Sequence, residues 1–265
     1  MPLTNPSTAS GGSTAASTGV FTQSADNLMP LMFGINDAVF PVSGGITPVN
    51  ANVELSTGLT TLYTCSTDKV AFVLNSLFYI TNVSGSNSTA VDVYVVGPGS
   101  SAGVANRFVI TTPNNNSPAT VTVPKHFMEP GEAIVIGNAA ANIVANAMFW
   151  EMDATTSMLV KRGQVSSTAG TSIYTCPDGK KAYFRQIEGF LTSTAASVQG
   201  AAVVLPDGST YHEKYAFFIS GITGRATFVF NQNFTRYLSS GEQVFLRSPS
   251  TEPLNYRMCV FETTG

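Results

Sequence analysis

One phrase that the chain spells twice limits its fold more than any other feature of the sequence. The segments "LYTCSTDKVAF" and "IYTCPDGKKAY" carry Cys65 and Cys176, which lie 111 positions apart. This spacing is about the length of a small β domain. We therefore interpret the chain as a duplicated unit.

A second pair of segments keeps nearly the same offset. "FMEPGEAIVI" and "YLSSGEQVFL" contain Gly131 and Gly241, which lie 110 positions apart. Each glycine follows a turn signal and is expected to adopt a positive φ angle. Cys65 and Cys176 are expected at the end of a first strand, directly before a turn. These four residues form the predicted structural turn of the repeat.

Both copies carry the pattern of antiparallel β-structure. Short apolar runs with strand period, such as "KVAFVLNSLFYITNV" and "AVDVYVVG", are separated by Gly, Pro, Asn and Ser clusters, and no helical stripe is sustained. The predicted fold class is all-β, with two tandem antiparallel β-sandwiches of jelly-roll or immunoglobulin-like topology. The expected boundaries are an extended arm over 1–58, a first sandwich over 59–153, a linker over 154–166 and a second sandwich over 167–265.

The composition limits the partners of the chain. Of its 265 residues 43% are hydrophobic and only 11% are charged, and the formal net charge is −3. A surface of Ser, Thr, Ala, Asn and Gly suits permanent packing against neighbours. Nucleic acid is not an expected partner, because no cluster of Lys and Arg is present to neutralise phosphates. A membrane is not expected either, because no apolar stretch has the length of a span and no signal-like segment is visible.

No pattern of catalytic or metal-binding residues stands out. Three cysteines make a disulfide framework unlikely to form and are expected as small buried hydrophobes. His126 and His212 lie in non-equivalent contexts, and Glu132 and Glu242 are interpreted as duplicated turn residues. We predict no enzyme activity, no catalytic residue, no metal and no cofactor.

The first 58 residues differ in kind from the rest. A polar tract of small residues, "NPSTASGGSTAASTG", precedes the apolar segment "LMPLMFGINDAVFPV", and such a tract does not fold alone. The apolar segment either packs across its own first sandwich or docks on a neighbouring subunit, and we favour docking. The predicted interface side chains of this arm are Leu28, Met29, Leu31, Met32, Phe33 and Phe40.

The Tyr-Thr-Cys segments at 63–65 and 174–176 support a family resemblance, together with the low charge, the tandem sandwiches and the arm. In these features the chain resembles the structural virion proteins of tailed bacteriophages, among them capsid decoration (cement) proteins and tail or neck components. The resemblance implies a virion location, a homo-oligomer of three or more subunits, and contacts with other virion proteins such as the major capsid protein. It implies no chemistry.

Other functions stay open beside a decoration protein. One is a tail, neck or fibre component, and another is a carbohydrate- or receptor-binding sandwich with a glycan as its partner. A glycan site would present aromatic side chains on a rim, and the single tryptophan, Trp150, is expected in a core instead, although Tyr211 is a candidate for exposure. An accessory domain of a secreted hydrolase is a third alternative.

Overall fold

The computed structural model of the chain describes twelve stretches of its sequence. These are residues 47–83, 90–113, 118–120, 126–138, 142–154, 158–166, 169–191, 200–204, 211–213, 226–231, 238–248 and 253–264. The predicted interface residues of the arm lie outside the described residues.

The first half forms two facing sheets. One has the order β1-β9-β3-β6, with β7 also paired to β3, and is called the β1 sheet; the other has the order β2-β8-β4-β5 and is called the β2 sheet. Together they make sandwich 1. Its elements are β1 (Thr47–Leu55), β2 (Gly58–Thr64), β3 (Lys69–Asn82), β4 (Val91–Val96), the short 3-10 helix η1 (Val104–Asn106), β5 (Arg107–Thr111), β6 (Pro118–Thr120), β7 (His126–Met128), β8 (Ala133–Asn138) and β9 (Ile143–Asp153).

The second half repeats this plan as sandwich 2. The β10 sheet has the order β10-β17-β12-β15, and the β11 sheet has the order β11-β16-β13-β14. The strands are β10 (Met158–Val165), β11 (Thr171–Thr175), β12 (Lys180–Leu191), β13 (Gly200–Val204), β14 (Tyr211–Glu213), β15 (Ala226–Asn231), β16 (Gln243–Arg247) and β17 (Leu254–Thr264).

The strand order decides between the two predicted topologies. In each half the first strand pairs antiparallel with the last, and the second strand pairs with the last but one in the opposite sheet. An immunoglobulin sandwich puts its first and last strands in different sheets, whereas this winding is that of an eight-stranded jelly roll, with two short strands, β6 and β7, sharing one place beside β3 in sandwich 1. The predicted all-β class is confirmed, and both sandwiches have jelly-roll order.

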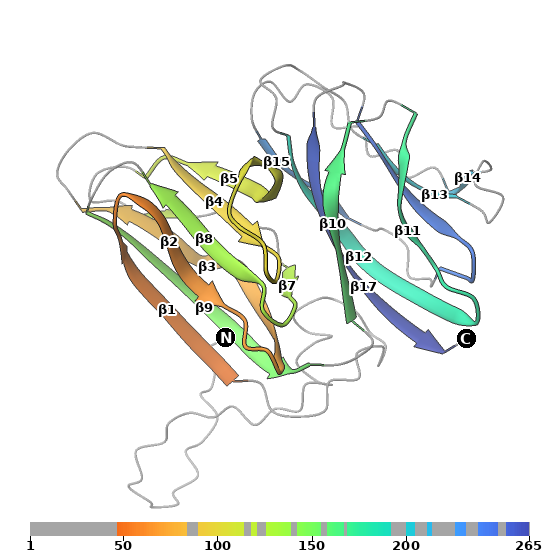
Figure 1. Cartoon of the computed structure of the whole chain (residues 1–265), viewed down its shortest axis with the longest axis horizontal. Helices are drawn as coiled ribbons and strands as arrows, with labels where there is room; N and C mark the ends of the chain where they lie inside the picture. Colours follow the sequence, from red (N-terminus) through yellow and green to blue (C-terminus); the bar gives the residue numbers. More distant parts are fainter. Residues whose placement is uncertain are drawn as a thin grey trace, which may run out of the picture.

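Strand alternation builds a separate core in each sandwich. In β9, Ile143, Ala145, Ala147 and Phe149 are buried, and the residues between them are only half-buried, as expected when successive side chains point to opposite faces. One hydrophobic cluster contains residues of sandwich 1 only, and a second contains residues of sandwich 2 only. Figure 1 shows the two sandwiches side by side, with the β5 and β7 edge of sandwich 1 next to β10, β12 and β17.

Two of the expected boundaries differ from the structure. Strand β1 lies within the range expected to be arm, and β10 lies within the range expected to be linker. In β1 the outward positions are polar, Val49, Ala51 and Val53 pack against the core, and Leu55 is part of it. In β10 the sequence "KRG" interrupts the apolar pattern, because this strand faces sandwich 1 rather than solvent. This interruption weakens the pattern of β10, whereas β1 alternates through Val49, Ala51, Val53 and Leu55 but was counted with the arm that precedes it.

Candidate functional site between the two sandwiches

The repeated phrase takes the same local structure in both halves. The backbone N–H of Cys65 donates to the carbonyl of Glu132 at 2.9 Å, and that of Gly131 donates to the carbonyl of Cys65 at 2.9 Å. Cys176 with Glu242 and Gly241 with Cys176 form the same two bonds at the same distances. The turn residues predicted from the repeat are thus brought together, in two equivalent turns.

The glycines and glutamates of these turns have distinct roles. Gly131 and Gly241 have φ angles of 79° and 78°, the left-handed region that glycine enters without steric cost. The Glu132 carboxylate accepts the backbone N–H of Glu129 at 3.0 Å, and the Glu242 carboxylate accepts that of Ser239 at 2.7 Å. Both glutamates therefore close their own turns, as the sequence led us to expect.

A buried tyrosine precedes each cysteine. The Tyr63 hydroxyl donates to Glu151 at 2.6 Å, and the Tyr174 hydroxyl donates to Glu262 at 3.0 Å. Burial, followed by the contact with Glu151, raises the pKa of Tyr63 well above its usual value, and burial followed by Glu262 does the same for Tyr174. Both hydroxyls stay protonated and serve as donors.

The cysteines are structural. Both Cys65 and Cys176 are buried as free thiols, and each Sγ donates to a backbone carbonyl, that of Lys69 at 3.2 Å and that of Lys180 at 3.4 Å. Burial raises the pKa of the Cys65 thiol to about 12 and also raises that of Cys176. A thiol of this kind is a poor nucleophile, because the thiolate is the reactive form.

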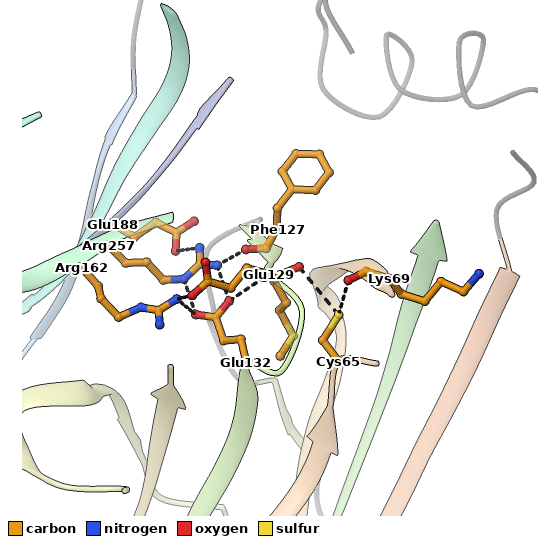
Figure 2. A network of polar contacts seen from close by, with 9 residues as sticks. Cys65, Lys69, Phe127, Glu129, Glu132, Arg162, Glu188 and Arg257 are labelled. Carbon is orange, nitrogen blue, oxygen red and sulfur yellow. Dashed lines mark hydrogen bonds and ion pairs between the residues drawn. The ribbon is translucent and has the colours of Figure 1, made fainter. Parts of the chain in front are cut away.

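The turn of sandwich 1 carries an ion network that joins the two sandwiches (Figure 2). Arg257, on β17, binds Glu132 in a bidentate manner, with Nε at 2.8 Å from Oε1 and Nη2 at 2.6 Å from Oε2. The same guanidinium donates to the backbone carbonyl of Phe127. Arg162, on β10, binds Glu129 and lies 3.1 Å from Glu132. Two strands of sandwich 2 therefore hold one turn of sandwich 1.

The central pair of this network is fully withdrawn from water. Arg257 is 1% exposed and Glu132 is 0% exposed, and a third carboxylate, Glu188, has its Oε2 at 3.6 Å from Nη1 of Arg257. Burial by itself would lower the pKa of Arg257, but Glu132 and then Glu188 outweigh this effect and raise it. The guanidinium is therefore charged, and within the described part of the chain its paired carboxylates are Glu132 of the other sandwich and Glu188 on β12.

A second set of contacts lies beside the ion network. The Asn255 side chain donates through Nδ2 to the carbonyls of Val104 at 2.6 Å and Arg107 at 3.0 Å, which belong to the η1 segment of sandwich 1. Gln164 in turn donates to Asn255 at 2.7 Å and orients its amide. Amide and guanidinium groups of β17 thus satisfy backbone carbonyls across the interface.

Aromatic packing and close approach complete the contact. The rings of Phe127 and Phe261 meet edge to face at 5.4 Å between centroids. A cavity of about 200 Å³ remains between η1, β10 and β17. Beside it, a Cβ atom on Gly97 would lie 1.8 Å from Nη1 of Arg162, so only glycine leaves room for that guanidinium.

The sequence indicated only part of this interface. Glu132 was interpreted as a turn residue, which is correct for its backbone contact but omits its ion pair. Arg257, Arg162 and Asn255 were not singled out, although an arginine inside the apolar closing strand "NYRMCVFE" is a signal for a buried ion pair. Trp150 was expected in a core; the structure places it half-buried, with its ring 6.5 Å from that of Phe72.

The described residues offer little for chemistry. No group of three or more His, Cys, Asp or Glu side chains among them could hold a metal ion. No helix in the same part of the chain is long and apolar enough to cross a membrane. The predicted absence of catalytic residues and cofactors stays a prediction.

Comparisons with known proteins add distant similarities only. No protein-family model and no curated protein matches the chain. Among solved structures it is similar to the STIV MCP, a viral major capsid protein, at 10% identity and a TM-score of 0.36, over 83% of this chain and 97% of that one. The major capsid protein P2 of bacteriophage PM2 follows with 11% identity and a TM-score of 0.31, over 82% and 97%. The tandem domain CBM22-1-CBM22-2 of Paenibacillus barcinonensis Xyn10C has 11% identity and a TM-score of 0.25, over 84% and 92%. With every TM-score below 0.5, these similarities do not place the chain in a family.

Proposed function

We propose that this protein is a non-enzymatic structural subunit of a virion, whose copies assemble with one another and with other virion proteins. The observation that carries the proposal is the interface between the sandwiches. Two jelly rolls are held edge to face by a dry bidentate ion pair and by side chains that satisfy backbone carbonyls. Such a contact makes one rigid block of the two sandwiches, which is what a particle subunit needs.

The chemistry of the chain supports the same function. The repeated phrase, which is the most distinctive part of the sequence, builds a turn and a buried core rather than a reactive centre. Its two thiols are buried and protonated, and its two glutamates are occupied by backbone N–H groups. A charged fraction of 11% leaves few repulsive contacts between copies.

Solution mass and electron microscopy test this proposal. The full chain, expressed alone and measured by light scattering over a range of concentrations, is expected to form discrete assemblies. Co-expression with other proteins of the same virus should place it in particles. A chain that stays monomeric at high concentration, both alone and with those proteins, would overturn the proposal.

A virion subunit of this kind either builds the shell itself or decorates a shell built by another protein. The resemblance stated above favours capsid decoration, with a tail, neck or fibre component as the alternative. A decoration protein binds only after another protein has built the lattice, so it is expected to bind preformed shells and to form no shell alone. A shell formed by this chain without a partner would exclude decoration.

One observation keeps a glycan-binding function as a second candidate. Trp150 is half-buried on the outward face of β9, beside the buried ring of Phe72, so one aromatic ring is partly accessible outside the cores. Aromatic rings of this kind stack on sugars. Binding of the purified chain to a glycan array, lost in Trp150→Ala, would support this function, and an array without signal would remove it.

A further inference from the structure

Each residue on the outward face of the β10 sheet can be aligned with a residue on the outward face of the β1 sheet. The outward face of the β10 sheet contacts sandwich 1. On this face β17 contributes Asn255, Arg257, Cys259 and Phe261. When the strands are aligned on the repeated turn, these positions correspond to Val144, Asn146, Met148 and Trp150 of β9. Arg162 of β10 pairs with Arg257, just as Asn52 of β1 pairs with Asn146.

The two outward faces differ sharply in burial. On the β10 sheet, Asn255, Arg257 and Phe261 are 0%, 1% and 7% exposed, because sandwich 1 covers them. On the β1 sheet the four β9 residues are only half-buried, and the outward residues of β1 are exposed, namely Pro48, Asn50, Asn52 and Glu54. The part of this face formed by β1 and the middle of β9 is therefore less covered in the first half than its counterpart in the second, whereas Val70, Phe72 and Met152 of the same face are 4%, 0% and 3% exposed.

The chain also carries a second copy of the edge that fits such a face. In the internal contact, the part of sandwich 1 that docks on the β10 sheet is the turn that ends in Glu132. In sandwich 2 the turn that ends in Glu242 has the same backbone hydrogen bonds and the same positive φ at its glycine, and its Ser239 and Ser240 are exposed. This turn leads into β16 of the β11 sheet, which lies on the side of sandwich 2 away from sandwich 1 (Figure 1).

We infer that the outward face of the β1 sheet binds the Ser239–Glu242 edge of a second copy of this chain, in a contact that repeats the internal one. This inference deepens the proposed function, on which it rests, by naming the partner and both surfaces. The contact uses two different patches, so it is heterologous and propagates head to tail into a ring or a filament.

The chemistry of the face indicates how this contact differs from the internal one. Asn52 and Asn146 stand where sandwich 2 has Arg162 and Arg257, so neutral amides replace both guanidiniums. Amides donate to a carboxylate without introducing charge, and Val144, Met148 and Trp150 supply apolar area around them. A hydrogen bond without ionic character is weaker than a charge-assisted pair, so the contact between copies is the more easily reversed of the two.

Asn146 provides the test with two opposite substitutions in the full chain. Asn146→Glu places a carboxylate against the Glu242 edge and is expected to weaken association by about tenfold or more. Asn146→Arg recreates the residue of the internal contact and should associate at least as tightly as the parent. Thr61→Glu, at an exposed position of β2, is the matched control and should leave association unchanged. Circular dichroism checks that each variant is folded, and sedimentation velocity over a concentration series measures its mass.

Trp150 offers an independent readout, because it is the only tryptophan and lies on this face. Its emission should shift to shorter wavelength as concentration rises, in parallel with mass. A shielded Trp150 in a chain that stays monomeric would mean that the chain's own arm covers the face, and would overturn the inference together with the proposed assembly. If Asn146→Glu assembles as the parent does, this face is not the contact, while the proposed function stands.

Cross-linking tests the pairing of surfaces directly. Asn52→Cys corresponds to Arg162 and Ser239→Cys corresponds to Glu129, which are in contact inside the chain. With a short bis-maleimide the double variant should give a ladder of covalent oligomers, and an equal mixture of the two single variants should give dimers. Dimers formed by Asn52→Cys alone would indicate a face-to-face contact, and the absence of cross-links in the mixture would contradict the pairing.

Discussion

Glu132 performs two tasks from one buried position. One carboxylate oxygen accepts the backbone N–H of Glu129, and the two oxygens together bind Arg257 of the other sandwich. The residue therefore couples the shape of a turn to the position of a neighbouring jelly roll. Glu242 performs the first task in the second half, and the residue of sandwich 1 that aligns with Arg257 is Asn146.

The ion pair predicts strong coupling in a double-mutant cycle. Glu132→Gln leaves the Arg257 charge buried with poorer compensation and is expected to lower the free energy of unfolding by about 3–5 kcal/mol. Adding Arg257→Met removes that charge, so the double variant should lose clearly less than the sum of the two single losses. Urea denaturation measures all four chains, and additive losses would contradict a direct pair.

The glycine of the turn predicts a difference between two alanine variants. Gly131→Ala forces a Cβ atom into a φ of 79°, which costs about 1–2 kcal/mol. Gly103 has an extended backbone and open space around its Cβ position, so Gly103→Ala should be close to neutral. Equal melting temperatures for the two variants would show that the left-handed turn does not persist in solution.

The tyrosine and thiol of the repeated phrase predict instability at alkaline pH. The folded pKa of Cys65 is raised from 9.0 to about 12 and that of Tyr63 is raised from 10.0, so both groups favour folding while they are protonated. Their stabilising contribution is complete below pH 9 and is lost as the pH rises from there towards the folded values, by up to about 1.4 kcal/mol per pH unit for each group. Denaturation from pH 8 to 11 should show this fall, and Tyr63→Phe should reduce it above pH 10. An unchanged slope in that variant would assign the fall to other groups.

Strand β17 is the element that joins the molecule, because both of its faces are buried. Leu254, Met258 and Val260 enter the core of sandwich 2, and Asn255 and Arg257 face sandwich 1. In its counterpart β9 one face is buried in the core, and Val144, Asn146, Met148 and Trp150 on the other face are half-buried. Burial on both faces explains why an arginine and an asparagine are tolerated within an apolar strand, since each finds its partners in the other sandwich.

The asparagine of β17 gives a prediction at this scale. Asn255→Asp would place carboxylate oxygens against the carbonyls of Val104 and Arg107, which repel them, whereas Asn255→Ala only leaves two acceptors unsatisfied. The aspartate variant should therefore unfold at a lower temperature than the alanine variant. The reverse order in calorimetry would mean that the amide does not donate across the interface.

The sequence predicted the duplicated turn, but it did not predict β1 and β10 as strands. The duplicated turn with Cys65, Gly131 and their counterparts could be predicted, because the same backbone conformation requires the same residue types in both halves. Strand β10 was assigned to the linker because Lys161 and Arg162 interrupt its alternation, and β1 was assigned to the arm although it alternates regularly, because it directly follows the arm's apolar segment. The sequence carries a signal for a buried ion pair at Arg257 but does not identify its partner, which lies 125 positions away in the chain.

At the scale of the whole molecule, we predict that the arm, which lies outside the described residues, contributes to assembly rather than to the stability of the sandwiches. Deleting residues 1–45 spares β1 and both cores, so the truncated chain should melt near the parent temperature. If the arm docks on a neighbour, as we propose, the truncated chain should lose attachment or assembly. A truncated chain that assembles normally but melts much earlier would make the arm an intramolecular strap.

The short connection between the sandwiches sets the order in which contacts form. Only four residues separate the end of β9 at Asp153 from the start of β10 at Met158. The edge of sandwich 1 therefore meets the β10 sheet at a local concentration in the millimolar range, whatever the amount of protein in the cell. The internal joint is therefore expected to form before any contact between chains, and dilution is expected to separate assembled chains without opening any of them.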